Sequence, residues 1–283
     1  MGFVFGVEQG RFVGSALAAG PWDPGSQHGG PPSALLAHAM ERHEPGWSDA
    51  DGQLMMSRVT TEIMRPVPVG EPLEVQVEVI QAGRRTHRLQ ATMEAGGKQV
   101  ARASGLRALT TEVELPPGMS MRDHERPPPG PDAAWERPRW MTGDVDWGRA
   151  GGRDLDAWSN FLDACDSRVV EGSWDDPGEC TAWIKVAADM VEGVGTTPIM
   201  RVLATADMSA AIGRVLQFED YLHPNADLNV HLTRYPASEW VGIRALMWVD
   251  GYGVAMGDGE LWDENGRIGR TTQSCVLTKR ESP

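Results

Sequence analysis

Cysteine is scarce in this chain. Only three of the 283 residues are cysteines, and none of them forms a C-x-x-C pair. An odd number of widely spaced cysteines argues against a disulfide framework and against a structural zinc site. We therefore expect Cys165, Cys180 and Cys275 to be packed thiols of a protein in a reducing compartment.

Positive charge and long apolar runs are also in short supply. Lys and Arg number 26 against 40 Asp and Glu, which leaves a net charge of −14. Because phosphate groups are bound by clustered Lys and Arg, this balance excludes nucleic acid and an anionic membrane as main partners. No apolar run approaches about 18 residues, and no signal-peptide pattern opens the chain. We expect a soluble, cytoplasmic protein with no membrane partner.

Several catalytic signatures are missing as well. The sequence has no G-x-S-x-G motif, which disfavours a serine esterase of the α/β-hydrolase kind. It also has no H-E-x-x-H motif and no phosphate-binding loop. We therefore expect no metal, no cofactor and no nucleoside triphosphate.

Alternating apolar residues dominate the rest of the sequence. The stretch "LEVQVEVI" (73–80) alternates strictly, and "RLQATME" (88–94) continues the pattern after a turn. The second half gives "ADLNVHLTR", "WVGIRALMWV", "GVAMGDGELWD" and "GRTTQSCVL" between Gly and Asn-Gly turns. A period of two is typical of half-buried antiparallel strands. Residues 113–152 are rich in Pro, Gly and charge, so we interpret them as a linker.

Three landmarks repeat along the chain with an offset near 169 residues. Arg65-Pro66, Gly83 and Gly97 in the first half match Arg234-Tyr235-Pro236, Gly251 and Gly266 in the second. We infer an internal duplication, with one half before the linker and one after it.

One helix precedes the strands in each half. The first is "HGGPPSALLAHAMER" (28–42), where Pro31 and Pro32 suit a first helical turn and the alanines keep the helix slim. The second is "TADMSAAIGRVLQ" (205–217), whose apolar residues are spaced for a buried face, with Asp207 near its start. A helix followed by an antiparallel sheet, given twice, predicts an α+β protein whose sheets curl around the helices.

These motifs resemble the double-hotdog acyl-CoA thioesterases of the thioesterase II group. The resemblance is carried by "HGGPPSALLAHAMER", "RVTTEIMRPVPVGEPLEVQVEVIQAGRR", "DLNVHLTRYPASEW" and "DENGRIGRTTQSCVL", in that order. It implies two hotdogs, 1–112 and 153–283, joined by the linker 113–152. In each hotdog a long antiparallel sheet wraps a central helix, and the two sheets pair into one continuous layer. It also implies an acyl-CoA substrate, an active site between the halves and an acyl tunnel beside the helix.

The resemblance further implies that a carboxylate, a hydroxyl and an amide hold the attacking water. The carboxylate falls on Asp207 and the amide on Gln273. The hydroxyl position holds Asn225, which departs from the family pattern but can still donate and accept hydrogen bonds. Without the resemblance, Asp207 would be interpreted as a helix-capping acid and Gln273 as a solvent-facing strand residue.

Five more residues are candidates for substrate binding. Gly29 and Gly30 precede the first helix, whose N-terminus could offer N–H groups to an oxyanion, as could the start of the second helix. His28 could contact the substrate, although a histidine before Gly-Gly is often a loop residue. Arg84 and Arg85 form the densest basic cluster of the chain, which could meet the phosphates of coenzyme A or simply lie solvated at a hairpin tip.

The sequence thus favours an acyl-CoA thioesterase that releases coenzyme A and a carboxylic acid. Two alternatives stay open. A hotdog hydratase or dehydratase would need an Asp/His pair, for which only His223 lies at a matching distance from Asp207 in sequence. A non-catalytic acyl-chain binding protein is kept open by Asn225. A homo-oligomer is also left open, because an outer sheet face often recruits further copies.

Overall fold

The computed structural model describes residues 2–44, 54–118, 126–138, 159–218 and 220–280. Of the expected linker 113–152, only 113–118 and 126–138 lie within the described residues. The first half contains β1 (Phe3–Glu8), β2 (Arg11–Gly14), α1 (Gly30–Arg42), β3 (Leu54–Ile63), β4 (Pro72–Ala82), β5 (Thr86–Ala95) and β6 (Lys98–Leu109). The second half contains β7 (Cys165–Glu171), β8 (Cys180–Val186), β9 (Asp189–Val191), α2 (Pro198–Ala206), α3 (Ser209–Ile212), β10 (Tyr221–Leu222), β11 (Asp227–Leu232), β12 (Trp240–Val249), β13 (Val254–Asp263), β14 (Gly266–Val276) and β15 (Thr278–Lys279).

Thirteen strands form one sheet in the order β7-β8-β12-β13-β14-β11-β3-β6-β5-β4-β2-β1-β9. Apart from β9, the order is symmetric about the antiparallel β11–β3 pair, with β7 matching β1, β8 matching β2 and so on inward. Gly83 and Gly251 lie in the equivalent β4–β5 and β12–β13 turns, while Gly97 lies in the β5–β6 turn and Gly266 is the first residue after the equivalent β13–β14 turn. The repeated landmarks of the sequence therefore occupy equivalent places in the sheet.

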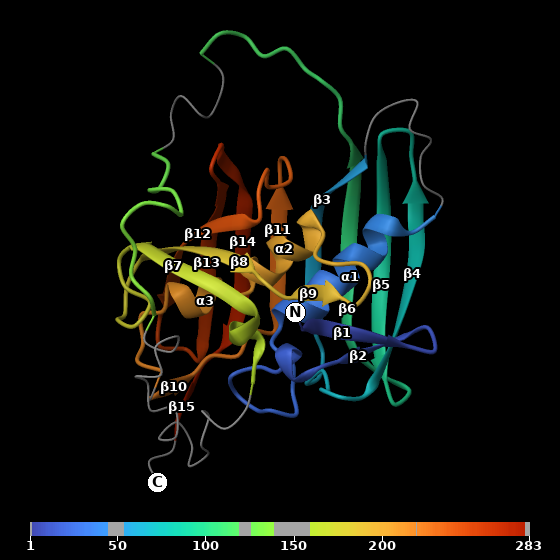
Figure 1. The fold of residues 1–283 in the computed structure, drawn as a ribbon, viewed down its shortest axis with the longest axis horizontal. Helices are drawn as coiled ribbons and strands as arrows, with labels where there is room; N and C mark the ends of the chain where they lie inside the picture. Colours follow the sequence, from blue (N-terminus) through green and yellow to red (C-terminus); the bar gives the residue numbers. More distant parts are fainter. Residues whose placement is uncertain (1, 45–53, 119–125, 139–158, 219, 281–283) are drawn as a thin grey trace.

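The sheet curls around two buried helices. Strand β9 follows β8 after two residues, yet it pairs with β1 at the other end of the sheet order. The two ends of the sheet must therefore approach each other, and Figure 1 shows α1 and α2 on the face that they enclose. Helix α1 packs against β3–β6 and against α2, while α2 packs against β8, β11 and β12. The strand-rich α+β class expected from the sequence is confirmed.

The period-two pattern explains which strand residues enter this core. Along β5, Leu89, Ala91 and Met93 are buried while Arg88 and Gln90 are exposed. Removing apolar side chains of this kind from water contributes roughly 1.5–3 kcal/mol each for the larger ones. The alternation therefore fixes the register, since a slip by one residue would turn the buried set toward solvent.

Close contact between α1 and α2 depends on small residues. Ten of the thirteen residues of α1 are buried, and its first turn is made of Gly30, Pro31, Pro32 and Ser33. A Cβ atom added to Gly30 would lie 2.9 Å from the carbonyl oxygen of Ala204 and 3.2 Å from its Cα atom. Only glycine at this position allows the start of α1 to touch the last turn of α2.

The predicted second helix is wrong in its boundaries. The helix of the second half is α2, Pro198–Ala206, and residues 205–217 form only its last residues, the short α3 and irregular structure. Thr197 is the N-cap residue of this helix, and Pro198 is its first residue. Proline is favoured there because its missing N–H would be unpaired at a helix start in any case.

Candidate active site

Asp207 lies between α2 and α3, not at the start of a helix as the sequence predicted. It is the C-cap residue of α2, and its N–H donates to the carbonyl of Leu203. Its side chain is only 2% exposed, so the carboxyl group must find hydrogen-bond donors within the protein. The end of α2 supplies none, because a helix C-terminus presents carbonyl oxygens.

Three side chains from distant parts of the chain donate to this carboxylate. Asn225 Nδ2 lies 2.8 Å from Asp207 Oδ1, and Gln273 Nε2 lies 3.0 Å from the same oxygen. His28 Nδ1 lies 2.8 Å from Asp207 Oδ2. The structure thus brings together Asp207, Asn225, Gln273 and His28, all of which the sequence singled out. A carboxylate offers about four acceptor sites, so one site on Oδ2 is left for a further donor.

The Gln273 amide is fixed in one orientation. Its Oε1 accepts from Ser209 Oγ at 2.7 Å and from the N–H of Ala210 at 3.0 Å. Because a backbone N–H can only donate, the other end of the amide must be Nε2, which donates to both the carbonyl and the carboxylate of Asp207. These four bonds leave Gln273 no position for a water molecule. Its place in the structure is that of a support for Asp207.

Asn225 retains an acceptor. Its Nδ2 donates to Asp207 Oδ1 and to the carbonyl of Asp227 at 3.2 Å, which uses both N–H bonds. Among the described residues no donor bonds to its Oδ1. Asp227 in turn accepts from the N–H of Ser274 at 2.6 Å, which ties the start of β11 to β14. The Asn225 amide is therefore held next to the carboxylate with its oxygen available.

His28 forms the Asp/His pair that the sequence did not predict. We expected only His223 at a matching distance from Asp207, and that expectation is wrong because the fold brings the residue before α1 to the end of α2. His28 Nδ1 also lies 3.2 Å from the N–H of Gly30. It cannot both accept from Gly30 and donate to Asp207, and the 2.8 Å contact with the carboxylate places the proton on Nδ1. Among the described residues, His28 Nε2 has no hydrogen-bond partner.

Gly29 and Gly30 bring the start of α1 against the carboxylate. A Cβ atom on Gly29 would lie 2.8 and 2.9 Å from the two carboxyl oxygens of Asp207 and 3.0 Å from Ile63 Cδ1. Pro31 and Pro32 have no N–H, so the backbone donors at this helix start are those of Gly29 and Gly30. The start of α1 at Gly29 therefore packs directly against the Asp207 carboxylate.

Cys275 lies near Asp207 without a hydrogen bond to it, whereas His223, two residues before Asn225, packs against Trp22. Burial lowers the pKa of His223 to about 4, and its ring packs edge-on against Trp22 with centroids 5.5 Å apart. Burial, and secondly the charge of Asp207, raises the pKa of the Cys275 thiol to about 12. Cys275 is thus a protonated thiol at neutral pH, and not a ready nucleophile. Its position two residues after Gln273, on the same face of β14, is the signal that could have found it.

Arg84 and Arg85 lie far from this cluster. Both are exposed in the β4–β5 turn. The strand register places Gln273 of β14 opposite Ala91 of β5, which lies four strands away in the sheet. The β4–β5 turn with the two arginines lies further along, just before Thr86, the first residue of β5. Measured along the sheet surface, strand spacings and rises separate the two arginines from Gln273 by roughly 25 Å. The structure does not bring them to the Asp207 cluster.

Metal-ligand clusters and membrane-spanning helices are missing from the described part of the chain. No three of its His, Cys, Asp or Glu residues are grouped so as to hold a metal ion. None of its helices is long and apolar enough to cross a membrane.

Comparisons with known proteins point to one family. A model described as the acyl-CoA thioesterase N-terminal domain matches residues 18–108, and one described as the acyl-CoA thioesterase C-terminal domain matches residues 88–277. A comparison with curated proteins found no match.

Solved structures share the fold over nearly the whole chain. A conserved protein of unknown function with a hot dog fold from Alicyclobacillus acidocaldarius has a TM-score of 0.68 at 16% identity, covering 98% of this chain and 96% of that one. The tesB protein of Mycobacterium avium subs paratuberculosis has a TM-score of 0.62 at 19% identity, with coverages of 95% and 92%. An acyl-CoA thioesterase II, TesB2, from Mycobacterium marinum has a TM-score of 0.60 at 14% identity, with coverages of 98% and 95%.

Proposed function

Because the chain belongs to the acyl-CoA thioesterase family, we propose that it hydrolyses acyl-CoA at the Asp207 carboxylate. The observation that supports this site is the convergence of three donors on Asp207 beside the start of α1. The products are free coenzyme A and a carboxylic acid. We also propose that the two symmetric halves are the two units of a double hotdog, 1–112 and 153–283, joined by 113–152.

The hydrolysis needs a positioned water, a base and a donor for the developing oxyanion. The free acceptor site of Asp207 Oδ2 and the Oδ1 atom of Asn225 can each accept one hydrogen from the same water molecule. As the water oxygen bonds to the thioester carbon, Asp207 takes its proton. The carbonyl oxygen becomes an oxyanion, and the donor that we propose for it is the backbone N–H of Gly29, the residue packed against Asp207.

Collapse of the tetrahedral intermediate breaks the carbon–sulfur bond. The electron pair of that bond leaves with sulfur as the coenzyme A thiolate, and the proton held by Asp207 is then available to it. Gln273 acts as a positioning residue, since all its hydrogen bonds are spent on Asp207, Ser209 and Ala210. No covalent acyl-enzyme is required in this scheme.

Release of free thiol from a panel of short, medium, long and aromatic acyl-CoAs tests the proposal. The chain's own cysteines are buried, so a thiol-reactive dye reports the product and not the protein. Turnover of at least one acyl class is expected. Tight binding of every acyl-CoA without thiol release would instead indicate an acyl-chain binding protein.

The Asp207–His28 pair favours one second candidate, a hydratase or dehydratase. In that chemistry the lone pair of His28 Nε2 would exchange a proton with a carbon atom beside the thioester while water adds to or leaves the chain. Incubation with enoyl-CoA separates the two functions, because hydration removes the enoyl absorbance without releasing thiol.

If His28 acts only by positioning Asp207, His28→Gln should lower thiol release about tenfold or more without creating a new pH optimum.

A further inference from the structure

Three aromatic rings and a guanidinium from distant segments of the chain form one cluster. Trp22, from the loop before α1, stacks on Phe218, with ring centroids 4.8 Å apart and an interplanar angle of 16°. His223 packs edge-on against both rings, with centroid distances of 5.5 and 6.4 Å. The guanidinium carbon of Arg280 lies 5.8 Å from the Trp22 ring and 5.1 Å from the Phe218 ring. We call these four residues the Trp22 cluster.

Backbone pairing places this cluster next to the catalytic carboxylate. The segment 223–226 runs antiparallel beside β14, to which it is joined by two backbone hydrogen bonds of 2.8 and 3.0 Å. Side chains alternate along such an extended segment, so His223 and Asn225 point to the same face, about 7 Å apart. Asn225 donates to the Asp207 carboxylate on this face. His223 is therefore the next side chain along the face after Asn225.

His223 carries a buried nitrogen without a partner in the described part of the chain. The residue is 4% exposed, and no group among the described residues forms a hydrogen bond with its Nε2 atom. Buried polar atoms normally have a partner, so a group from outside these residues is expected to bond here. Burial lowers the pKa of His223 to about 4, so the ring is neutral at neutral pH. A neutral imidazole offers one donor and one acceptor, which suits an amide.

An acyl-CoA carries an amide at the matching distance. The nitrogen of the first amide in its pantetheine arm is four bonds from the thioester carbon, which is about 5–6 Å in an extended chain. A thioester carbon held beside Asp207 and Asn225 would therefore bring this amide to the level of His223. The stacked rings of Trp22 and Phe218 suit the methylene groups of the same arm, because aromatic faces pack well against apolar chains.

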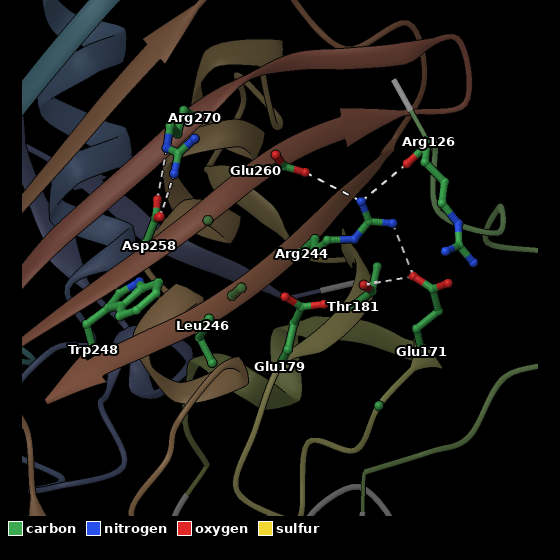
Figure 2. A pocket seen from close by; sticks show the side chains of 13 residues that line it. Arg126, Glu171, Glu179, Thr181, Arg244, Leu246, Trp248, Asp258, Glu260 and Arg270 are labelled. Atoms are coloured by element: carbon green, nitrogen blue, oxygen red, sulfur yellow. Dashed lines mark hydrogen bonds and ion pairs between the residues drawn. The ribbon is translucent and has the colours of Figure 1, made fainter. Parts of the chain in front are cut away.

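The phosphates of coenzyme A need a positive charge near the end of this arm. Arginines also line a groove of about 570 Å³ on the outer face of the second half, but Figure 2 shows them among carboxylates. There Arg244 Nη2 lies 3.2 Å from Glu171 Oε2, and Arg270 donates to both carboxyl oxygens of Asp258, at 2.9 and 2.5 Å. Arg280 contacts the two stacked rings and a backbone carbonyl, and it is partly exposed. Its charge therefore lies at the edge of the Trp22 cluster.

The geometry points to the Trp22 cluster as the site that binds the coenzyme A part of the substrate, an inference that rests on the proposed hydrolysis. His223 Nε2 bonds the first amide of the pantetheine arm. The rings of Trp22 and Phe218 cover the arm, and Arg280 attracts the phosphates. Because the amide is anchored at a fixed distance from the thioester, His223 sets where the thioester carbon stops relative to Asp207.

Two thioesters of the same acyl group test the role of His223. The N-acetylcysteamine thioester keeps the first amide of the arm, and the ethyl thioester lacks it. His223→Phe keeps a ring against Trp22 and Phe218 but removes Nε2. We expect it to lower kcat/KM by about 3- to 10-fold for the amide-bearing thioester and to leave the ethyl thioester unchanged. His38→Phe is the matched control, because His38 is also buried with an unpartnered nitrogen among the described residues, and it should leave the ratio of the two kcat/KM values unchanged.

Acyl-CoA itself tests the role of Arg280. Arg280→Gln should raise KM for acyl-CoA by about threefold or more at low ionic strength, and added salt should weaken this effect. The N-acetylcysteamine thioester has no phosphate, so its KM should not change. Arg88→Gln removes an exposed charge on β5 and should change neither value. An unchanged KM for acyl-CoA in Arg280→Gln would overturn this role of Arg280.

Calorimetric titration with free coenzyme A tests the cluster without turnover. A wild type that hydrolyses no thioester would refute the proposed function, whereas this titration would still decide the further inference. His223→Phe and Arg280→Gln should each weaken binding by about threefold or more, and His38→Phe should not. An equal loss on both thioesters in His223→Phe would overturn the inference and indicate that Nε2 bonds only an internal water. So would an unchanged affinity for coenzyme A in both variants.

Discussion

Gly29→Ala is a small change whose effect can be worked out from the site geometry. The new Cβ atom would lie 2.8 Å from Asp207 Oδ1, whereas ordinary contacts begin near 3.4 Å. Either the carboxylate or the start of α1 must therefore shift by about 0.6 Å. A catalytic group displaced by about 1 Å costs as much as 100-fold in rate, so we expect kcat/KM for thiol release to fall between about 10- and 100-fold.

The stability of the variant should change much less than its activity. The clash involves the end of a side chain and Ile63 Cδ1, which can move more easily than backbone can. Overpacking of this kind costs about 1 kcal/mol at the low end of its range, which urea unfolding would measure. Gly130→Ala is the matched control, because a Cβ there meets nothing within 4 Å. Activity of Gly29→Ala within threefold of wild type would refute the placement of Asp207 in the reaction.

Three further predictions concern the fold around the site. Gly30→Ala should lower the free energy of unfolding by about 1–3 kcal/mol, because its Cβ meets the backbone of Ala204; an unchanged urea midpoint would contradict this helix contact. Cys275→Ser should keep activity within a few-fold of wild type, and a complete loss of thiol release would implicate the thiol in catalysis. Burial lowers the pKa values of His38 and His223 from 6.5 to about 4, so the unfolded chain binds more protons between these values. Stability should then fall as pH falls from about 6.5 toward 4, by about 1.4 kcal/mol per pH unit and histidine, and a flat profile in urea titrations would contradict their burial.

The strands could be predicted from the sequence because one face of each is buried. Alternation located β4, β5 and β11–β14 to within a few residues, and the repeated turn landmarks anticipated the symmetric strand order. Which strands pair with each other in the sheet could not be predicted in the same way. Nothing local indicates that β3 pairs with β11, or that β9 pairs with β1 across the closed side of the sheet.

The apolar pattern of residues 205–217 mispredicts the second helix because it reports burial and not helical structure. Met208 and Ile212 are buried as the pattern required, but they belong to the break after α2 and to the single turn of α3. The Thr197-Pro198 pair was the better start signal. It also agrees with the internal duplication, since Pro198 lies 167 residues after Pro31, close to the offset of the other landmarks.

Local sequence patterns could not predict the contacts within the site, because these contacts join residues that are far apart in the sequence. Asp207 and Gln273 were singled out through the family resemblance, and the geometry that joins them depends on β14 lying beside the α2–α3 break. The contact between His28 and Asp207 depends on two helices whose residues are far apart in sequence. The close contact between Gly29 and the Asp207 carboxylate results from how α1 and α2 pack. The glycine allows this contact, but its presence in the sequence does not predict it.

Thiol release by Asp207→Asn, compared with wild type and with the exposed control Asp250→Asn, tests the central claim most directly. The amide keeps the size of the carboxylate but cannot take a proton from water. Loss of a general base lowers rates by about 10²- to 10⁴-fold, and we predict a fall of kcat in that range for Asp207→Asn and none for Asp250→Asn. A kcat for Asp207→Asn within about tenfold of wild type, in a folded variant, would contradict the account.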